Sequence, residues 1–276
     1  MWVIVSALVA ALLLVPGAGA PAERPVAIPA SGGVTLAGSL LVPDGRGPFP
    51  AAVLVNGFGP QDRDGGAGGA YRRLAEGLAR RGLVVLRYDK RGIGGSGGPA
   101  LSWLDARPLA ADAAAAVRLL AAIPGIDTRR VTLVGHSQGG DLAFAAARRS
   151  PATRIVSLSA PGRPLGLLPR AAGTASRFLR RLVGPVIADA TLQADPLRDA
   201  AAARQPALLV QGTRDRTVPF ADMARLAAAR RAAGHLTRTL PVPGAGHFLQ
   251  VEGRVPLRTL DAIVDPTAIG PMTASW

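Results

Sequence analysis

The stretch VTLVGHSQGGDLAFAAARR, residues 131–149, decides the fold. An apolar run typical of a buried strand comes first, and a segment with the composition of a helix follows it. Between them, Gly135, Ser137 and Gly139 match the pattern Gly-x-Ser-x-Gly, in which a serine nucleophile stands on a sharp turn. Glycine on both sides leaves room for such a turn, where side chains would collide. The stretch therefore predicts a strand, a tight turn and a helix, with Ser137 as the nucleophile at the turn.

A second copy of the pattern lies upstream, in the stretch GIGGSGGP at residues 92–99, with Ser96 at its centre. In a chain with 34 glycines, a chance match has a probability of roughly 0.2, so the context must decide between the two serines. Ser96 also follows an apolar run, but two glycines and Pro99 come next and no helix begins there. We therefore expect Ser96 to lie in a flexible loop that Asp89 and Arg91 brace.

Short apolar runs and helical stretches alternate on both sides of residues 131–149. Strands are expected at residues 51–57, 83–89, 130–135, 154–160, 206–212 and 235–242, helices at 71–82, 109–122 and 138–150, and an antiparallel hairpin at 25–43. Continuous apolar runs indicate strands buried on both faces, so the chain predicts an α/β fold with a mostly parallel sheet and helices on both faces. Ligands bind such sheets beyond the carboxyl ends of the strands.

One interval breaks this alternation within the single domain expected at residues 21–276. Residues 161–205 contain no strand candidate, but they include the helical stretch RFLRRLVGPVIADATL. We expect a short helical cap inserted above the carboxyl ends of the strands. A long crossover helix is the alternative.

The general base must come from the three histidines, because a serine hydroxyl is a poor nucleophile without one. His247 directly follows the strand candidate TRTLPV, whereas His235 lies at the start of the same strand. His136 is adjacent to Ser137 inside the turn, where we expect it to pack. His247 is therefore the candidate base.

The base needs an orienting carboxylate. Asp215 follows the strand candidate PALLV, again at a carboxyl end, whereas the rival Asp222 falls on the following helix. The resulting chain order of Ser137, Asp215 and His247 is the order expected when the nucleophile stands on a strand-to-helix turn.

The remaining site residues follow from the same edge of the sheet. An oxyanion needs two fixed N–H donors, and one should come from Gln138, directly after the nucleophile. The other should come from the loop after strand 51–57, where Phe58 is the expected donor and Gly57 the alternative. Phe220 and Phe248 lie close to the acid and the base in sequence, and we expect them to form walls of a modest apolar substrate pocket.

The first twenty residues, MWVIVSALVAALLLVPGAGA, carry no charged side chain and end in a small-residue cleavage pattern. This predicts a secretory signal peptide at residues 1–20 and a secreted or cell-envelope protein, with an N-terminal membrane anchor as the alternative. Cysteine is absent, and a core of this size can be stable without disulfides.

The net charge of +14 comes almost entirely from arginine, and Lys90 is the only lysine. The arginines are scattered, as on solvated helix faces, so we expect a weak attraction to an anionic cell envelope at most. No nucleic-acid motif supports a nucleic-acid partner, and no histidine cluster has the spacing of a metal site. We therefore expect neither a metal nor a cofactor.

Taken together, the segments GHSQGG, GTRDRTVP and GAGHF resemble the nucleophile, acid and histidine segments of the α/β-hydrolase family. The segments NGFGPQDRDG and LRYDKRGIGGSG are similar to a bacterial branch of exported hydrolases of esterase or dipeptidyl-peptidase-like type. The resemblance covers roughly residues 26–264 and implies a Ser/Asp/His hydrolase without a cofactor. Asn56 departs from the wider family, which often has His there. Asp62, Arg63 and Asp64 are expected to form a charged brace beside the oxyanion loop.

The leading functional hypothesis is a serine carboxylesterase that acts on a small-molecule ester. A peptidase or thioesterase on the same three residues is the second hypothesis, because fold and triad do not fix the substrate. A basic, exported, envelope-binding protein without enzymatic activity is the third.

Overall fold

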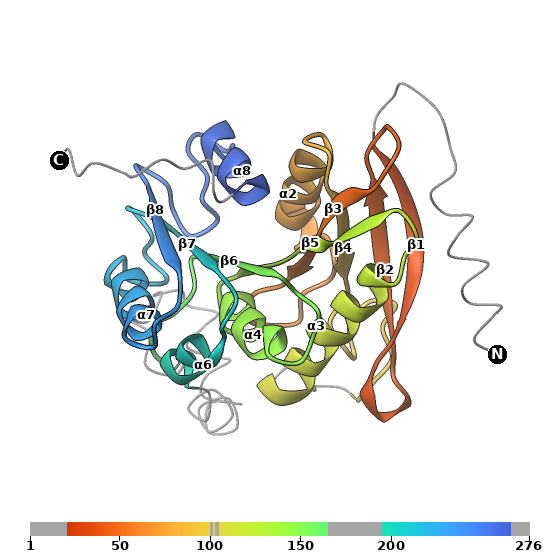
Figure 1. Cartoon of the computed structure of the whole chain (residues 1–276), viewed down its shortest axis with the longest axis horizontal. Helices are drawn as coiled ribbons and strands as arrows, with labels where there is room; N and C mark the ends of the chain where they lie inside the picture. The colour runs from red at the N-terminus through yellow and green to blue at the C-terminus, as the bar shows by residue number, and fades with distance from the viewer. Residues whose placement is uncertain (1–20, 100–101, 103–104, 165–194, 266–276) are drawn as a thin grey trace.

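The computed structural model describes residues 21–99, 102, 105–164 and 195–265, and one eight-stranded sheet forms its centre (Figure 1). The strands lie in the order β1-β2-β4-β3-β5-β6-β7-β8. They are β1 Ala22–Pro29, β2 Thr35–Val42, β3 Phe49–Val55, β4 Val84–Tyr88, β5 Ile126–His136, β6 Arg154–Leu158, β7 Ala207–Gly212 and β8 Thr237–Val242. The β1–β2 and β2–β4 pairs are antiparallel, and all the other pairs are parallel. The predicted α/β fold and its N-terminal hairpin are thus confirmed.

Helices cover both faces of the sheet (Figure 1). They are α2 Ala70–Ala79, α3 Ala106–Ala121, α4 Gln138–Ala147, α6 Pro196–Ala202, α7 Ala221–Ala232 and α8 Leu257–Val264, with short 3₁₀ turns η1 Ser31–Gly33 and η2 Gly66–Gly68. One apolar core lies beneath α3, α4, α6 and α7, and a second lies beneath α2 and α8. The sheet separates these two cores.

Strand β3 shows why continuous apolar runs identify these strands. Its residues Ala51, Val53 and Val55 enter the first core, and Ala52 and Leu54 enter the second. Side chains alternate between the two faces of a strand, so a strand covered on both faces must be apolar at every position. All five side chains are at most 2% exposed.

Polar residues set the boundaries that the apolar pattern misses. The Asp105 carboxylate accepts a hydrogen bond from the Arg107 N–H (3.0 Å) and so caps α3 at Ala106, before the predicted start at residue 109. Strand β5 begins at Ile126 rather than at residue 130, because its first part pairs with β3 through Phe49 although residues 128–130 are exposed and polar.

The interval expected to form the cap ends in α6. This helix packs against α4 and α7, so it belongs to the helix layer on one face of the sheet. The rest of the expected cap falls mainly on residues 165–194, which lie outside the described residues, as does the expected signal peptide at residues 1–20. Within the described ranges, no helix combines the length and the apolar character needed to cross a membrane.

Candidate active site

The turn between β5 and α4 holds Ser137 in a rare backbone conformation. Its φ is 55° and its ψ is −125°, outside the regions that residues with side chains normally adopt. Glycines make this turn possible, because a Cβ on Gly135 would overlap the Gly139 carbonyl, and one on Gly139 would overlap the Val55 carbonyl. The Ser137 N–H donates to the Leu158 carbonyl (2.8 Å), which ties the turn to β6. Such strain persists only where surrounding structure holds it, and it gathers at functional sites.

A histidine and an aspartate meet beyond the carboxyl ends of β7 and β8. His247 Nδ1 lies 2.8 Å from Asp215 Oδ2. The other carboxylate oxygen accepts hydrogen bonds from the Thr217 and Val218 N–H groups, at 2.8 and 2.9 Å. Burial by itself raises the pKa of Asp215, but His247 and these two N–H groups hold that pKa below its usual value. The Asp215 carboxylate is therefore ionised at neutral pH.

His136 connects several segments through its two ring nitrogens. Its Nε2 lies 2.9 Å from the His247 carbonyl oxygen, which can only accept, so Nε2 carries the proton. Its Nδ1 accepts from the Tyr71 hydroxyl (3.0 Å), which in turn accepts from the Gly57 N–H (2.8 Å). Burial lowers the pKa of His136 to about 3, so the ring stays neutral. This chain of hydrogen bonds ties the Ser137 turn to α2, to the loop after β3 and to the His247 loop.

The loop after β3 lies directly against the turn. A Cβ added to Gly57 would lie 3.2 Å from the Ser137 Cβ. Lys90 Nζ donates to the Gly57 carbonyl, to the Gly59 carbonyl (3.2 Å) and to Gln138 Oε1 (3.2 Å). The lysine is 2% exposed, and burial lowers its pKa to about 7. It joins the loop to the first residue of α4.

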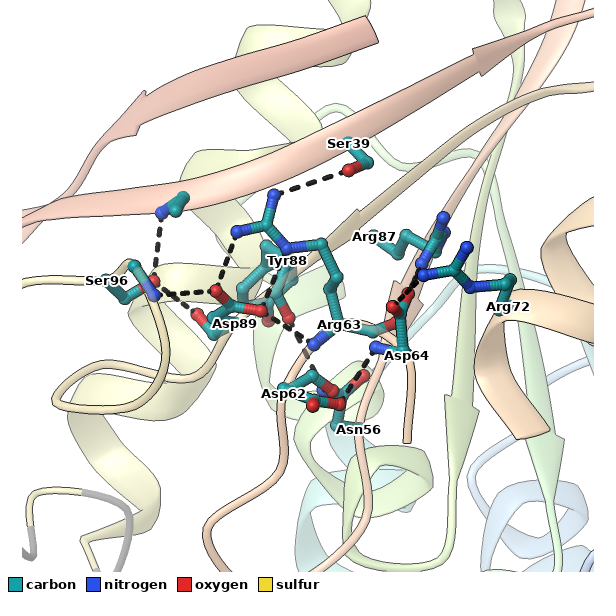
Figure 2. A network of polar contacts seen from close by, with 12 residues as sticks. Ser39, Asn56, Asp62, Arg63, Asp64, Arg72, Arg87, Tyr88, Asp89 and Ser96 are labelled. Carbon is teal, nitrogen blue, oxygen red and sulfur yellow. Dashed lines mark hydrogen bonds and ion pairs between the residues drawn. The ribbon is translucent and has the colours of Figure 1, made fainter. Parts of the chain in front are cut away.

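Charged side chains support the same loop farther along the chain (Figure 2). The Arg63 guanidinium grips the Asp89 carboxylate through two hydrogen bonds of 2.9 and 2.7 Å. The Asp62 carboxylate accepts hydrogen bonds from the N–H groups of the three residues after Arg63, at 2.8 to 3.0 Å. The Asp64 carboxylate pairs with Arg87. The predicted brace of Asp62, Arg63 and Asp64 is thus confirmed.

Asn56, which departs from the wider family, also belongs to this support. Its side-chain amide donates to the Asp62 carbonyl (2.7 Å) and to the Tyr88 carbonyl (3.3 Å). Asn56 therefore holds the loop after β3 against the end of β4 (Figure 2).

Ser96 is tied down rather than flexible. Its hydroxyl donates to the Asp89 carbonyl (2.7 Å) and accepts from the Ala37 N–H (2.9 Å), and the residue is only 9% exposed. Asp89 braces this loop as predicted, because its carboxylate also accepts from the Gly95 N–H (2.9 Å). The expectation of a flexible loop is wrong. The buried Asp89 and the neighbouring strand β2 form hydrogen bonds with the loop, and a glycine-rich sequence gives no sign of these partners.

The rival acid and the remaining histidine have other partners. The Asp222 carboxylate pairs with Arg163 and accepts from the Gly162 N–H (3.1 Å), which fixes α7 to the segment after β6. His235 lies just before β8, and its Nε2 is 2.9 Å from the carbonyl oxygen of Ala201 on α6. Among the described residues, His247 alone of the histidines forms a hydrogen bond with an aspartate carboxylate.

Comparison with known families and proteins identifies the family of this chain. The sequence model of the family described as serine aminopeptidase, S33, matches residues 53–195, more than half of the chain. The chain is an α/β-hydrolase of this family. An esterase, EstD, of Thermotoga maritima is 39% identical over 132 residues, which are 47% of this chain and 31% of the esterase. An uncharacterized protein of Mycobacterium tuberculosis is 30% identical over 258 residues, covering 90% of this chain and 82% of that protein. The matched part of the hydrolase thus corresponds to under a third of EstD.

Solved structures show the same fold at low sequence identity. An esterase of Pyrococcus furiosus superposes with a TM-score of 0.72 at 18% identity, covering 91% of this hydrolase and 96% of that chain. The α/β-hydrolase GrgF of a Penicillium species gives a TM-score of 0.69 at 19% identity, with 88% and 98% covered. At such identities, the likeness concerns the fold alone.

The two aromatic residues expected to line a substrate pocket have different surroundings in the hydrolase. Phe248 stacks on His136 with ring centroids 4.7 Å apart and lines a cavity of about 250 Å³ between α2 and α8. Phe220 lies directly before α7, is 41% exposed and does not line this cavity. Their roles in substrate binding stay predictions.

Two residues of the site region were missed by the sequence analysis. Tyr71 lies on the buried face of an ordinary amphipathic helix, and nothing in its sequence surroundings indicates a partner in the Ser137 turn. Lys90 did leave a signal, because it is the only lysine in a chain with 32 basic residues. Its position directly after a predicted strand, at the carboxyl edge, was a second signal.

Proposed function

We propose that this hydrolase cleaves small carboxylic esters through an acyl-enzyme on Ser137, with His247 as general base and Asp215 as its partner. The observation that carries the proposal is the 2.8 Å hydrogen bond between Asp215 and His247, at the same edge of the sheet as the strained turn at Ser137. An aspartate, a histidine and a serine on a strand-to-helix turn form the triad expected of this fold.

In the proposed reaction, Ser137 Oγ attacks the acyl carbon while His247 Nε2 takes the hydroxyl proton. The tetrahedral intermediate then collapses, and His247 returns that proton to the leaving alcohol. Water repeats the sequence on the acyl-enzyme: His247 takes a proton from the water, the carboxylic acid leaves, and Ser137 regains its proton.

Asp215 supports this role through the tautomer of His247. Its ionised carboxylate accepts the Nδ1 proton, so Nε2 carries the lone pair that a general base needs. The same carboxylate stabilises the imidazolium that forms while His247 holds the proton of Ser137. The depressed pKa of Asp215 keeps this charge in place at neutral pH.

The proposed oxyanion donors are the N–H groups of Gln138 and Phe58. Gln138 follows the nucleophile and opens α4, whose N-terminus carries a positive partial charge. The Gly57 N–H already donates to the Tyr71 hydroxyl, which argues against Gly57 as the donor from the loop after β3. Phe58, the next residue and the donor expected from the sequence, is the one that we propose.

The ester substrate is supported by the similarity to the esterase EstD, which is 39% identical over 132 residues. A peptidase is the second candidate, because the matching family is described as serine aminopeptidases, and a thioesterase would use the same triad. We also propose that residues 1–20 are a signal peptide and that the protein is secreted or located in the cell envelope. Weak binding to an anionic envelope through the scattered arginines is the remaining, non-enzymatic candidate.

A fluorophosphonate probe tests the nucleophile, and a small substrate panel tests the chemistry. We expect the probe to label the wild-type protein but not Ser137→Ala. We also expect p-nitrophenyl acetate and butyrate to be cleaved faster than the dodecanoate, because a modest pocket fills and then clashes with longer chains. Cleavage of dipeptide anilides alone would favour the peptidase. A folded wild-type protein that neither reacts with the probe nor cleaves any substrate would favour the envelope-binding candidate.

A further inference from the structure

Lys90 is an unusual residue for this chain. It is the only lysine, and it is buried directly beneath the proposed oxyanion loop. No carboxylate of the described residues lies within ion-pair distance of its Nζ, whereas the buried cations Arg87 and Arg91 both have such partners. A buried charge without a counter-ion lowers stability unless hydrogen bonds satisfy it, so the hydrogen bonds of Nζ must account for this side chain.

The three acceptors around Nζ belong to the two segments that carry the proposed oxyanion donors. Nζ donates to the Gly57 and Gly59 carbonyls on the loop after β3 and to the Gln138 side chain at the start of α4. An ammonium group has three N–H donors, and here each of them has an acceptor. The planar fork of an arginine has no matching geometry for three converging acceptors around one atom.

The contact with Gly57 bears directly on the assigned donor. The Gly57 carbonyl and the Phe58 N–H belong to one peptide group, and in a trans peptide they point in opposite directions. Holding the carbonyl at Nζ therefore fixes the direction of the Phe58 N–H. The adjacent positive charge also polarises this peptide and makes its N–H a stronger donor.

We propose that Lys90 is a positioning residue of the oxyanion hole: its Nζ group fixes the Gly57–Phe58 peptide and Gln138 and, when protonated, adds a positive charge near the developing oxyanion. The inference rests on the proposed function, because it assumes an oxyanion at Phe58 and Gln138. In a buried site a charge acts over a longer distance than in water, so Lys90 need not touch the substrate.

The first test uses two Lys90 variants and p-nitrophenyl butyrate. Removing a direct oxyanion donor lowers kcat by about 10²–10³-fold, and we expect about 10–100-fold for Lys90→Met, which acts one step away, with KM changed less than about threefold. Lys90→Gln, which keeps N–H donors without the charge, should fall in between. Affinity for a trifluoromethyl ketone, which forms an oxyanion adduct, should fall by the same factor as kcat/KM.

Arg230→Met provides the matched control. Arg230, on α7, is also fully buried and is also held by backbone carbonyls, but by those of Ala200, Ala203 and Gln205 in the helix layer. This variant should lose thermal stability and keep its kcat within about twofold. A folded Lys90→Met or Lys90→Gln with the wild-type kcat would overturn the inference.

A measurement on the unmodified protein covers the case in which neither variant folds. Labelling with ¹⁵N-lysine gives one side-chain signal, which we would titrate with and without a boronic acid that forms a tetrahedral anion on Ser137. The groups facing Nζ are two carbonyls and a carboxamide, which do not titrate, and the neighbouring Asp89 and Arg91 are paired with Arg63 and Asp112. We expect the adduct to raise the pKa of Lys90. An unchanged titration would contradict the inference, whereas failure of the probe to label Ser137 would contradict the proposed function instead.

Discussion

The two Gly-x-Ser-x-Gly motifs of this chain, around Ser96 and Ser137, share a pattern but differ in the hydrogen bonds and the backbone conformation of the serine. Each follows a strand of the central sheet, β4 or β5. The Ser96 hydroxyl has both a donor and an acceptor in the fold, and its residue lies outside the left-handed region of backbone space. Ser137 has a φ of 55°, and its hydroxyl forms no capping hydrogen bond with the helix that it precedes. The Ser96 hydroxyl thus holds its loop in place, whereas the Ser137 hydroxyl does not cap the helix that follows it.

The difference teaches that the glycines of the two motifs have different tasks. Around Ser137 they permit close contacts between main-chain segments, because added Cβ atoms would overlap backbone carbonyls. Around Ser96, Gly94 permits a left-handed turn, with a φ of 55°, next to the Gly95 N–H that donates to Asp89. The motif therefore specifies a tight turn in both places, and only its surroundings specify a nucleophile.

Replacing the two serines should produce the largest contrast. We expect Ser137→Ala to lower kcat for p-nitrophenyl butyrate by a factor on the order of 10⁶, the scale seen when a triad nucleophile is removed. Ser96→Ala should keep kcat within a fewfold of wild type. It should nevertheless cost about 1–3 kcal/mol of unfolding free energy, because the Ala37 N–H loses its acceptor. An inactive but fully folded Ser96→Ala would reverse our assignment.

Two aspartates show a similar contrast, because Asp215 contacts His247 whereas Asp222 is paired with Arg163. Asp215→Asn should lower kcat by about 10⁴-fold, because an amide can donate to Nδ1 and stabilise the wrong tautomer of His247. Asp222→Asn should change kcat of the folded protein by less than about tenfold, since its carboxylate is engaged with Arg163. Its main effect should be a lower melting temperature. Equal kcat for wild type and Asp215→Asn would remove Asp215 from the triad.

Two glycine variants should sharpen the comparison at the level of folding. Gly139→Ala forces a Cβ against the Val55 carbonyl, so the loss of stability should exceed the ~1–3 kcal/mol typical of overpacking. In the other motif, a Cβ on Gly97 would lie 3.6 Å from the Thr35 carbonyl oxygen, an ordinary contact. Gly97→Ala should therefore stay within about 0.5 kcal/mol of wild type. Urea unfolding of both variants measures this, and comparable midpoints would refute the close-contact argument.

The last expected effect is a pH dependence of stability that is present around Asp141 and absent around Asp89 between pH 5 and pH 8. Burial raises the pKa of Asp141, on α4, to about 8, with Asp199 and Asp195 adding to the shift. The folded state then binds more protons than the unfolded state between about pH 4 and 8, so stability falls as pH rises through this window. Asp141→Asn should remove this fall, and its melting temperature relative to wild type should increase from pH 5 to pH 8.

The control for this effect is Asp89, which supports the Ser96 loop. Burial would raise its pKa, but Arg63 and backbone N–H groups hold the pKa below its usual value. Its contribution to stability is present above about pH 4 and is lost only as pH falls further. Asp89→Asn should therefore be less stable than wild type by a constant margin from pH 5 to pH 8. If the stability difference between Asp89→Asn and wild type changed with pH as it does for Asp141→Asn, the opposite pKa shifts of the two aspartates would be contradicted.

The sheet was predictable from the sequence because burial on both faces leaves a simple record. Strands such as β3 and β7 are apolar at nearly every position, and the helices between them have an apolar stripe. The first part of β5 was missed, since residues 128–130 are exposed and a pairing through the main chain does not require apolar side chains. The pattern of apolar residues reflects burial, so it does not reveal a strand end that faces solvent.

The candidate site was predictable where a residue follows a strand and was not predictable where it depends on a partner elsewhere. Asp215 and His247 could be chosen because both stand after apolar runs, and the structure brings their side chains into contact. Tyr71 and Lys90 contribute through contacts with main-chain atoms of other segments. Any segment can offer a carbonyl or an N–H group, so such contacts leave no pattern of residue types to recognise.

The missing side chain of Gly139 has a consequence for how this hydrolase can diversify. Because the Val55 carbonyl occupies the space of that Cβ, the separation of β3 from α4 is set by main-chain contact. Phe58 follows β3 and Gln138 opens α4, so the spacing of the two proposed N–H donors is insulated from side-chain change elsewhere. Side chains such as Phe220 and Phe248 can then vary without retuning this spacing, as long as their loops keep the lengths that place Asp215 and His247. A library for directed evolution of substrate range can accordingly vary those side chains and leave the loop lengths and the β3–α4 contact unchanged.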